Sequence, residues 1–305
     1  MRVLITGATG FVGREIVRQA HAAGHRLRIL VRNPQAQALE ELRLIYRPEV
    51  HAGDLLEPGS LEKALDGIDA VVHLVGIISE VGNNTFENAH HRATRNLVSE
   101  ARRAKVNRFV HMSALGTRPD AVSRYHQTKW QAEEAIRASG LSFTIFRPSL
   151  IYGPEDHFVN LFARLARSSP VLPVMGPGRA RFQPIAVDVV ATAFVRALNE
   201  PKSIAHTFDL CGPEALTFPE ILDQILSVTG YKRLKVRVPQ VLARVQARFL
   251  ESFFQNVLKK APPLNRDQLV MLQEDNVGQG RPADELFGLK HQAFRDGIAK
   301  YLSTS

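Results

Sequence analysis

The sequence predicts an α/β fold, a doubly wound parallel sheet with a smaller lobe contributed by the C-terminal half. In the first 150 residues, short apolar runs alternate with helical patterns, which is typical of βαβ units. The runs are rich in Val, Ile, Leu and Phe, as expected for strands covered by helices on both faces. A glycine-rich turn directly follows the first run, where such sheets bind ligands.

The strands of the sheet are expected at regular intervals along the first half of the chain. Six are predicted: Val3–Thr6, Leu27–Val31, Val50–Ala52, Ala70–Leu74, Arg108–Met112 and Ser142–Arg147. After Tyr152, glycines and prolines punctuate a stretch that reads as loop-rich. Three further elements are then expected to return to the core: a strand at Phe182–Val187, a helix at Asp188–Leu198 and a strand at Thr207–Cys211. The remainder reads as mostly helical.

These patterns divide the chain into two parts. We assign residues 1–150, with 185–212 returning to them, to the sheet domain, and 151–184 with 213–305 to a smaller, mostly helical lobe. A length of 305 residues suits two lobes better than one small core.

The composition indicates a globular protein of a reducing compartment. Hydrophobic residues make up 45% and charged residues 23% of the chain. Cys211 is the single cysteine, which excludes a disulfide framework, and no spaced His/Cys cluster suggests a metal site. Because Met1–Ile5 already reads as a buried strand, we expect no targeting segment and a cytoplasmic location.

Positive charge is concentrated in one C-terminal stretch. The net charge is +9, and Tyr231–Ala261 holds eight lysines and arginines against one acid. Within 239–260, apolar residues recur at helical spacing opposite a basic face. The helix could pack its apolar face on the lobe, or it could dock peripherally on an anionic membrane or a membrane-bound complex. No pattern indicates nucleic-acid binding.

The glycine-rich turn predicts a dinucleotide site. It sits between the first strand and a helix and reads Gly7-Ala8-Thr9-Gly10-Phe11-Val12-Gly13. Small residues at such a turn let backbone N–H groups approach a pyrophosphate, and the helix N-terminus adds partial positive charge. A tight strand–helix turn without a ligand is the alternative, which the strand–turn–helix context disfavours.

The end of the second strand favours NADP(H) over NAD(H). NAD-preferring sites usually place an acid here to hold the ribose hydroxyls, but this chain has Arg32. The guanidinium of Arg32, with that of Arg14, could pair with a 2′-phosphate, although both could simply be solvated. After the third strand, Asp54 and Leu55 are expected to contact the adenine. After the fourth strand, Val75 and Gly76 are expected to contact the central ribose and phosphates.

Several later motifs, taken with this turn, resemble the extended short-chain dehydrogenase/reductase superfamily. They are Tyr125-x-x-x-Lys129, Arg147-Pro148 continuing to Tyr152-Gly153-Pro154, Ile185–Val189 and Phe208–Gly212. The chain looks closest to an atypical branch, which includes the NAD(P)H-binding accessory subunit of respiratory complex I and related quinone-biosynthesis proteins. That narrower resemblance rests on Asn265–Leu269 and Asp275–Val277.

The resemblance implies a catalytic pair and a cofactor contact. Tyr125 would be the general acid/base, and Lys129 would lower its pKa and hold the nicotinamide ribose, with Pro148 also against the cofactor. Tyr125 and Lys129 are four residues apart and share one helix face. A hydroxyl that polarises the substrate carbonyl is expected at Ser113, although the alignment favours Ala114 for that position. His90 stands where the family has a relay asparagine.

Three functions remain open from the sequence. One is an NAD(P)H-dependent oxidoreductase acting on a carbonyl or quinone-like, possibly lipid-like, small molecule. The second is a nucleotide-binding protein of respiratory-complex assembly or quinone biosynthesis in which the chemistry is vestigial. The third is a nucleotide-sugar epimerase or dehydratase, which the atypical serine region and the short spacing from Ser113 to Tyr125 weaken.

Overall fold

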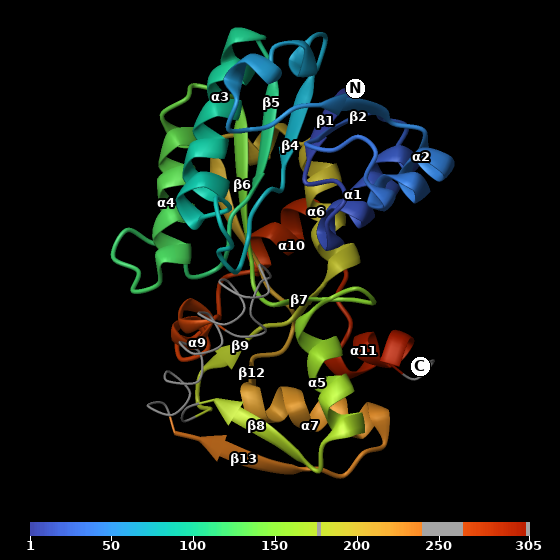
Figure 1. The fold of residues 1–305 in the computed structure, drawn as a ribbon, viewed down its shortest axis with the longest axis vertical. Helices are drawn as coiled ribbons and strands as arrows, with labels where there is room; N and C mark the ends of the chain where they lie inside the picture. The colour runs from blue at the N-terminus through green and yellow to red at the C-terminus, as the bar shows by residue number, and fades with distance from the viewer. Residues whose placement is uncertain (176–177, 240–264, 303–305) are drawn as a thin grey trace.

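The computed structural model describes residues 1–175, 178–239 and 265–302 and contains a seven-stranded parallel sheet (Figure 1). The strand order is β11-β6-β5-β4-β1-β2-β3. The strands are β1 (Arg2–Thr6), β2 (Arg26–Val31), β3 (Glu49–Ala52), β4 (Ala70–His73), β5 (Arg108–Met112), β6 (Phe143–Pro148) and β11 (His206–Leu210). Each neighbouring pair is parallel. The carboxyl ends of all seven strands therefore meet at one edge, which is where ligands bind in such sheets.

Helices cover both faces of this sheet, so the predicted doubly wound fold is confirmed. On one face α1 (Phe11–Ala22) packs against α6 (Val187–Ala197), and on the other α3 (Ala93–Arg103) packs against α4 (Arg124–Arg137). Shorter elements complete this part: α2 (Glu40–Tyr46), α10 (Arg281–Phe287), the 3₁₀ turns η1 (Gln37–Leu39), η2 (Pro58–Ser60), η3 (Lys63–Leu65) and η5 (Pro201–Ser203), and the π-helical turn η4 (Glu87–Arg92).

Alternation along the strands sorts the core into two layers. Ile5 and Val72 face the cluster that contains α1 and α6, whereas Leu4, Val71 and Phe109 face the cluster that contains α3 and α4. By the same alternation, polar residues at or near the ends of the central strands turn their side chains toward α3 and α4. They are Thr6 and His73, the last residues of β1 and β4, and His111, the last but one of β5, and all three are buried.

In the part of the chain that the structure describes, the smaller lobe contains four helices, one of them short, and three two-stranded sheets. Its helices are α5 (Phe158–Ser168), α7 (Phe218–Thr229) and α11 (Phe294–Leu302), with the short α9 (Arg266–Met271) beside them. The strand pairs are β7 (Ile151–Tyr152) with β10 (Ile185–Ala186), β9 (Arg181–Phe182) with β12 (Leu216–Thr217), and β8 (Val171–Met175) with β13 (Leu234–Val238). The rings of Phe158, Phe162 and Phe218 lie 5.2–5.8 Å apart between α5 and α7.

Three expectations for the second half need correction. The single strand predicted over Phe182–Val187 is two short strands, β9 and β10, separated by Gln183 and Pro184. Pro184 lacks an N–H for strand pairing, which helps to explain the break. The stretch predicted as loop-rich contains α5 and β8, and the remainder predicted as mostly helical contains β13.

The amphipathic stretch at 239–260 lies, except for Pro239, outside the described residues. Among the helices that the structure describes, none is both long and apolar enough to cross a membrane. The division of the chain at 150, 184 and 212 stays our interpretation of the fold.

Candidate active site

The glycine-rich turn brings β1, α1 and the end of β4 into close contact. Gly7 has a φ of +76°, and a side chain there would lie 3.2 Å from the backbone N of Val75. The N–H of Gly10 donates to the carbonyl of Gly7 at 3.1 Å. A Cβ on Gly13 would lie 2.1 Å from that same carbonyl oxygen. Only glycine lets α1 approach β1 this closely.

The first turn of α1 fits the pyrophosphate of a dinucleotide. Gly10 is the residue before the helix, and no side chain caps the first N–H groups. Those groups are therefore available to an anion at the positive end of the helix. The tight glycine packing and the uncapped helix N-terminus together match the needs of this cofactor.

Lys129 extends from α4 to the end of β4. Its Nζ donates to the carbonyl of Met112 at 2.9 Å, and it lies 3.0 Å from where a Cβ of Gly76 would be. The side chain is 2% exposed, and burial lowers the pKa of Lys129 to about 8, with Glu133 opposing the shift. The glycine turn, Val75, Gly76 and the Lys129 ammonium thus form one continuous surface at the carboxyl edge of the sheet.

Tyr125 lies one turn before Lys129 on α4, inside an aromatic pocket. Its ring meets those of Phe86, His90 and His126 edge-on, at centroid distances of 5.9, 5.1 and 5.2 Å. Burial raises the pKa of the Tyr125 phenol to about 12. The resemblance implies a pKa lowered by Lys129, whereas in the protein alone desolvation raises the pKa of this tyrosine.

His90 connects the loop after β4 to α4. Thr128 donates its hydroxyl to the carbonyls of Arg124 and Tyr125, so it accepts from His90 Nδ1 at 2.9 Å. His90 Nε2 is then left to accept the Ile77 N–H at 3.1 Å. Burial, reinforced by Lys129, holds the pKa of His90 well below its usual range. This neutral histidine therefore ties the loop that contains Gly76 to the helix that carries Tyr125.

A buried chain of hydrogen bonds continues from His90 into the sheet. Thr94 donates to the carbonyl of His90 at 2.5 Å and accepts from His73 Nε2 at 3.0 Å. His73 Nδ1 is 2.6 Å from the hydroxyl of Thr6, at the last residue of β1. Burial, with Lys129 adding to the effect, lowers the pKa of His73 to about 3. The carboxyl ends of β1 and β4 are thereby fixed to α3.

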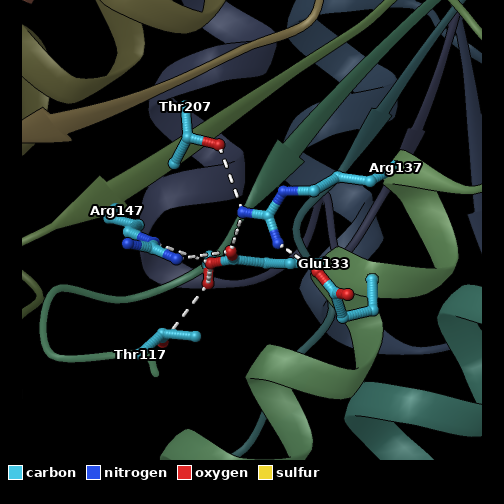
Figure 2. A network of polar contacts seen from close by, with 7 residues as sticks. Thr117, Glu133, Arg137, Arg147 and Thr207 are labelled. Atoms are coloured by element: carbon cyan, nitrogen blue, oxygen red, sulfur yellow. Dashed lines mark hydrogen bonds and ion pairs between the residues drawn. The ribbon is translucent and has the colours of Figure 1, made fainter. Parts of the chain in front are cut away.

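Ser113 belongs to a different network, on the Glu133 side of α4. Its hydroxyl donates to Glu133 at 2.5 Å and lies 3.4 Å from Thr117. Figure 2 shows the fully buried Glu133 carboxylate between the guanidinium groups of Arg137 and Arg147. Arg147 donates two bonds, at 2.8 and 2.6 Å, and Arg137 donates one at 2.5 Å. The Ser113 hydroxyl is therefore occupied by the protein itself.

The two arginines expected at the 2′-phosphate are placed differently. Arg14 pairs with Glu41 on α2 at 2.7 Å and also donates to the carbonyl of Thr9 at 3.3 Å. Arg32 is exposed at the end of β2, and within the described part of the chain it makes no hydrogen bond or ion pair. Arg32 is thus the cation that is free to meet an incoming anion.

The remaining predicted cofactor residues line the same edge with their backbone more than with their side chains. Val12 and Leu55 are buried at 8% exposure, and Pro148 is buried at the end of β6. Asp54 accepts the N–H of Leu56 at 2.9 Å, which shapes the turn after β3. Phe11 packs beside Gly153, where a Cβ would lie 3.1 Å from its ring.

Sequence reasoning did not assign a role to Glu133 or to Asn276. Glu133 follows Lys129 by four residues, so helical spacing places it on the same stripe of α4 as Tyr125. Asn276 lies in the C-terminal motif but reaches back to the sheet: it accepts from the Ser149 hydroxyl at 2.6 Å and donates to the carbonyl of Leu115 at 3.1 Å. Arg137 lies four residues after Glu133, a local signal that could have indicated this pair, whereas the other partners of Glu133 and those of Asn276 are too distant in sequence for a local pattern to reveal them.

The fold and this edge define a dinucleotide-binding protein of the extended short-chain dehydrogenase/reductase type. Residues 3–211 match the NAD dependent epimerase/dehydratase family, and the chain belongs to that family. The resemblance stated from the motifs is therefore confirmed.

Relatives in the family have different named activities. The chain is 34% identical to the ceramide reductase of Caulobacter vibrioides, over 78% of this chain and 73% of that protein. It is 30% identical to sterol demethylase protein B of Methylococcus capsulatus, over 98% of each. It is 27% identical to NADH dehydrogenase (ubiquinone) 1 alpha subcomplex subunit 9 of Arabidopsis thaliana, over 90% of this chain and 70% of that subunit.

Solved structures share the fold at lower identity. UDP-glucuronic acid 4-epimerase from Bacillus cereus, in complex with UDP-glucuronic acid and NAD, matches with a TM-score of 0.75 at 19% identity, over 100% of this chain and 99% of that one. UDP-glucose 4-epimerase from Thermotoga maritima matches with a TM-score of 0.76 at 18% identity, over the same shares. At these identities the likeness concerns the fold alone.

Proposed function

We propose that the protein is an NAD(P)H-dependent reductase of a carbonyl group on a lipid-like or quinone-like molecule. The observation that carries the proposal is the approach of Lys129 to Gly76, at the end of β4 beside the glycine turn, with Tyr125 one helical turn away. A cofactor bound along that edge would bring its nicotinamide ribose to Lys129.

The roles of the residues follow from their placement. The backbone N–H groups at the start of α1 bind the pyrophosphate, and Lys129 orients the nicotinamide ribose. A nicotinamide cofactor bound there would supply the hydride that reduces the carbonyl carbon. As the C=O π bond breaks, Tyr125 donates its phenolic proton to the oxygen, which leaves an alcohol product. The Lys129 cation stabilises the phenolate that remains until solvent restores the proton.

The pKa of Tyr125 favours the reductive direction. A phenol with a pKa of about 12 keeps its proton at neutral pH and can act as an acid. An enzyme working as a dehydrogenase needs the phenolate first, which this desolvated pocket disfavours. The protonated Tyr125 can therefore serve as the acid in the proposed reduction.

The relatives support the substrate class. The names ceramide reductase and sterol demethylase protein B both refer to lipid-like molecules. A sugar nucleotide, as in the epimerases of similar fold, is the less favoured substrate because those structures are under 20% identical to this chain.

NADPH is the proposed cofactor, and Arg32 tests this choice. Arg32→Ala should weaken NADPH by about 1–3 kcal/mol, the value of a charge-assisted hydrogen bond, and leave NADH unchanged. Titration calorimetry with both nucleotides measures the two affinities. Arg26, exposed at the other end of the same strand, provides the matched control. Equal losses for both nucleotides, or none, would contradict the assignment.

Tyr125→Phe tests the chemistry. With ceramide-, sterol- and quinone-type carbonyl compounds as substrates, the variant should lose about 10²- to 10⁴-fold in kcat while NADPH binding is retained. Unchanged turnover would show that Tyr125 is not the acid.

A non-catalytic role as a nucleotide-binding subunit is the second candidate. It is favoured by the occupied hydroxyl of Ser113 and by the similarity to a complex I subunit. The variant Ser113→Ala distinguishes the catalytic from the non-catalytic role. A large loss of kcat at unchanged stability would mean that the Ser113 hydroxyl contacts the substrate. Tight NADPH binding without turnover of any carbonyl substrate would favour the second candidate.

A further inference from the structure

The β8–β13 pair has an apolar face on the side away from the core. The strands are parallel and in register, so Val171 pairs with Leu234, Pro173 with Val236 and Met175 with Val238. Alternation places these six residues on one face, which we call the outer face. Every residue of the outer face is apolar.

The opposite face of the same pair packs on the lobe. Leu172 and Val174 are buried in the main core, at 0% and 2% exposure. Lys235, which lies between the exposed Leu234 and Val236, reaches Asp223 of α7 at 2.6 Å. The usual pattern, polar outside and apolar inside, is thus reversed at β13.

Much of the outer face is exposed. Leu234 is 67%, Val236 43% and Val171 40% exposed. Among the described residues, Leu269 of α9 packs against Met175 and Val238 and so covers one end of the face. Figure 1 shows β8 and β13 at the end of the molecule opposite the seven-stranded sheet. Burial of these exposed apolar side chains against a partner would be favourable.

The charge around the outer face indicates what covers it. The stretches 157–182 and 224–239, which contribute α5, β8, the end of α7 and β13, contain eight arginines and lysines and no acid. Two of these cations are neutralised by acids from elsewhere, Lys235 by Asp223 and Arg181 by Asp275. Lys232 is exposed two residues before Leu234, whereas the exposed Arg237 pairs with Val174 and so lies on the same face of β13 as Lys235. A partner that covers the outer face should therefore have an apolar interior and an anionic surface.

We propose that the outer face docks the protein on a lipid bilayer that carries anionic headgroups. Leu234, Val236 and Val171 enter the boundary between headgroups and acyl chains, and the surrounding cations meet the lipid phosphates. Three exposed side chains on two short strands are too few for a stable protein interface, which needs about 800 Å² from each partner. Shallow insertion into a bilayer needs no such area. This inference is independent of the proposed reaction.

Vesicle cosedimentation of the full chain tests the proposal. Wild-type protein should bind phosphatidylcholine vesicles that contain phosphatidylglycerol, bind pure phosphatidylcholine vesicles weakly, and dissociate at high salt. The double variant Leu234→Asp/Val236→Asp should reduce the partition coefficient by about tenfold or more, since it removes insertion and adds two repelling charges. The control, Leu44→Asp/Ile45→Asp, changes two exposed apolar residues of α2 and should bind as wild type does.

A second measurement reports on the face directly and does not depend on the folding of the Asp variant. Cys211 is buried and is the single native cysteine, so Leu234→Cys can be labelled selectively with a polarity-sensitive fluorophore. Its emission should shift to the blue on anionic vesicles and return at high salt.

Several outcomes would overturn the proposal. One is that the wild-type protein does not bind vesicles, and another is that it binds neutral and anionic vesicles equally. A third is that the Leu234→Asp/Val236→Asp variant binds as the wild type does, a result that would assign the membrane contact to 239–260 or to another surface. Unchanged emission of the fluorophore at position 234 on anionic vesicles would also overturn the proposal. A concentration-dependent dimer that the Asp variant abolishes without lipid would assign the outer face to a second copy of the chain.

Discussion

The buried Glu133 carboxylate should contribute far more stability than its exposed neighbour Glu134. Glu133 is 0% exposed and accepts bonds from Arg147, Arg137 and Ser113. Glu133→Ala leaves two guanidinium groups without their buried counterion. Breaking such a pair costs about 3–5 kcal/mol. Glu134 pairs with the same Arg137 at 2.7 Å but is 54% exposed, so Glu134→Ala should cost about 0–1 kcal/mol.

Thermal and urea unfolding of the two alanine variants measure this difference. With an unfolding entropy of about 2.1 cal/mol/K per residue, a loss of about 4 kcal/mol lowers the Tm by roughly 6 °C for Glu133→Ala. Glu133→Gln keeps the shape and one acceptor but loses the charge, so its Tm should fall between those of wild type and Glu133→Ala. Equal and small losses for Glu133→Ala and Glu134→Ala would refute the reasoning that burial makes this ion pair important.

Three further predictions follow from the site. Gly10→Ala should fold normally, because its Cβ would meet only the carbonyl oxygen of Gly7, at 3.3 Å, but it should lose nucleotide binding. Gly13→Ala should be less stable in urea unfolding, because its Cβ would lie 2.1 Å from the same oxygen. Similar stability of the two variants would contradict this prediction. Glu41→Gln removes the carboxylate nearest to the Arg14 guanidinium, at 2.7 Å, and leaves that of Glu155 at 3.8 Å. The variant should bind NADPH but not NADH more tightly in calorimetry, and unchanged NADPH affinity would show that Arg14 does not reach the 2′-phosphate. The pKa of His73 falls from 6.5 unfolded to about 3 folded, so the unfolded state binds the extra proton between these values. The free energy of unfolding should therefore fall as the pH drops below 6.5, by up to about 1.4 kcal/mol per pH unit from this residue, and His73→Gln should flatten that slope in urea titrations.

The parts of the fold that local patterns encode could be predicted from the sequence. The strands of the first half and the glycine turn were predicted because each is a short apolar run or a fixed spacing of small residues. The pairing of β8 with β13 was missed, since Pro170 and Pro173 read as loop signals and the partner strand lies some sixty residues away. A strand that is stabilised by a distant neighbour leaves a weak local signal.

The candidate site shows the same limit. The spacing of Tyr125 and Lys129 predicts a shared helix face, and the structure places both there. Which groups are already occupied could not be predicted: Arg14 is held by Glu41 and Ser113 by Glu133, each at least 20 residues away in the chain. Residue type and spacing indicate what a side chain can do, but its partners decide whether it is available.

The hydrogen bonds of Asn276 have a consequence for how the chain can be divided. Its backbone N–H donates to Arg181 and its carbonyl accepts from Gln183, while its amide bridges Ser149 and Leu115. Residues from three distant places in the chain, at 115, 149 and 181–183, are thus joined by the side chain and the peptide groups of one residue. A protein cut short before residue 276 would leave buried polar atoms unsatisfied at the carboxyl ends of β5 and β6. Truncation of the chain to the seven-stranded sheet would therefore destabilise the edge where the cofactor would lie. The sheet domain and the smaller lobe depend on each other and form one evolutionary unit.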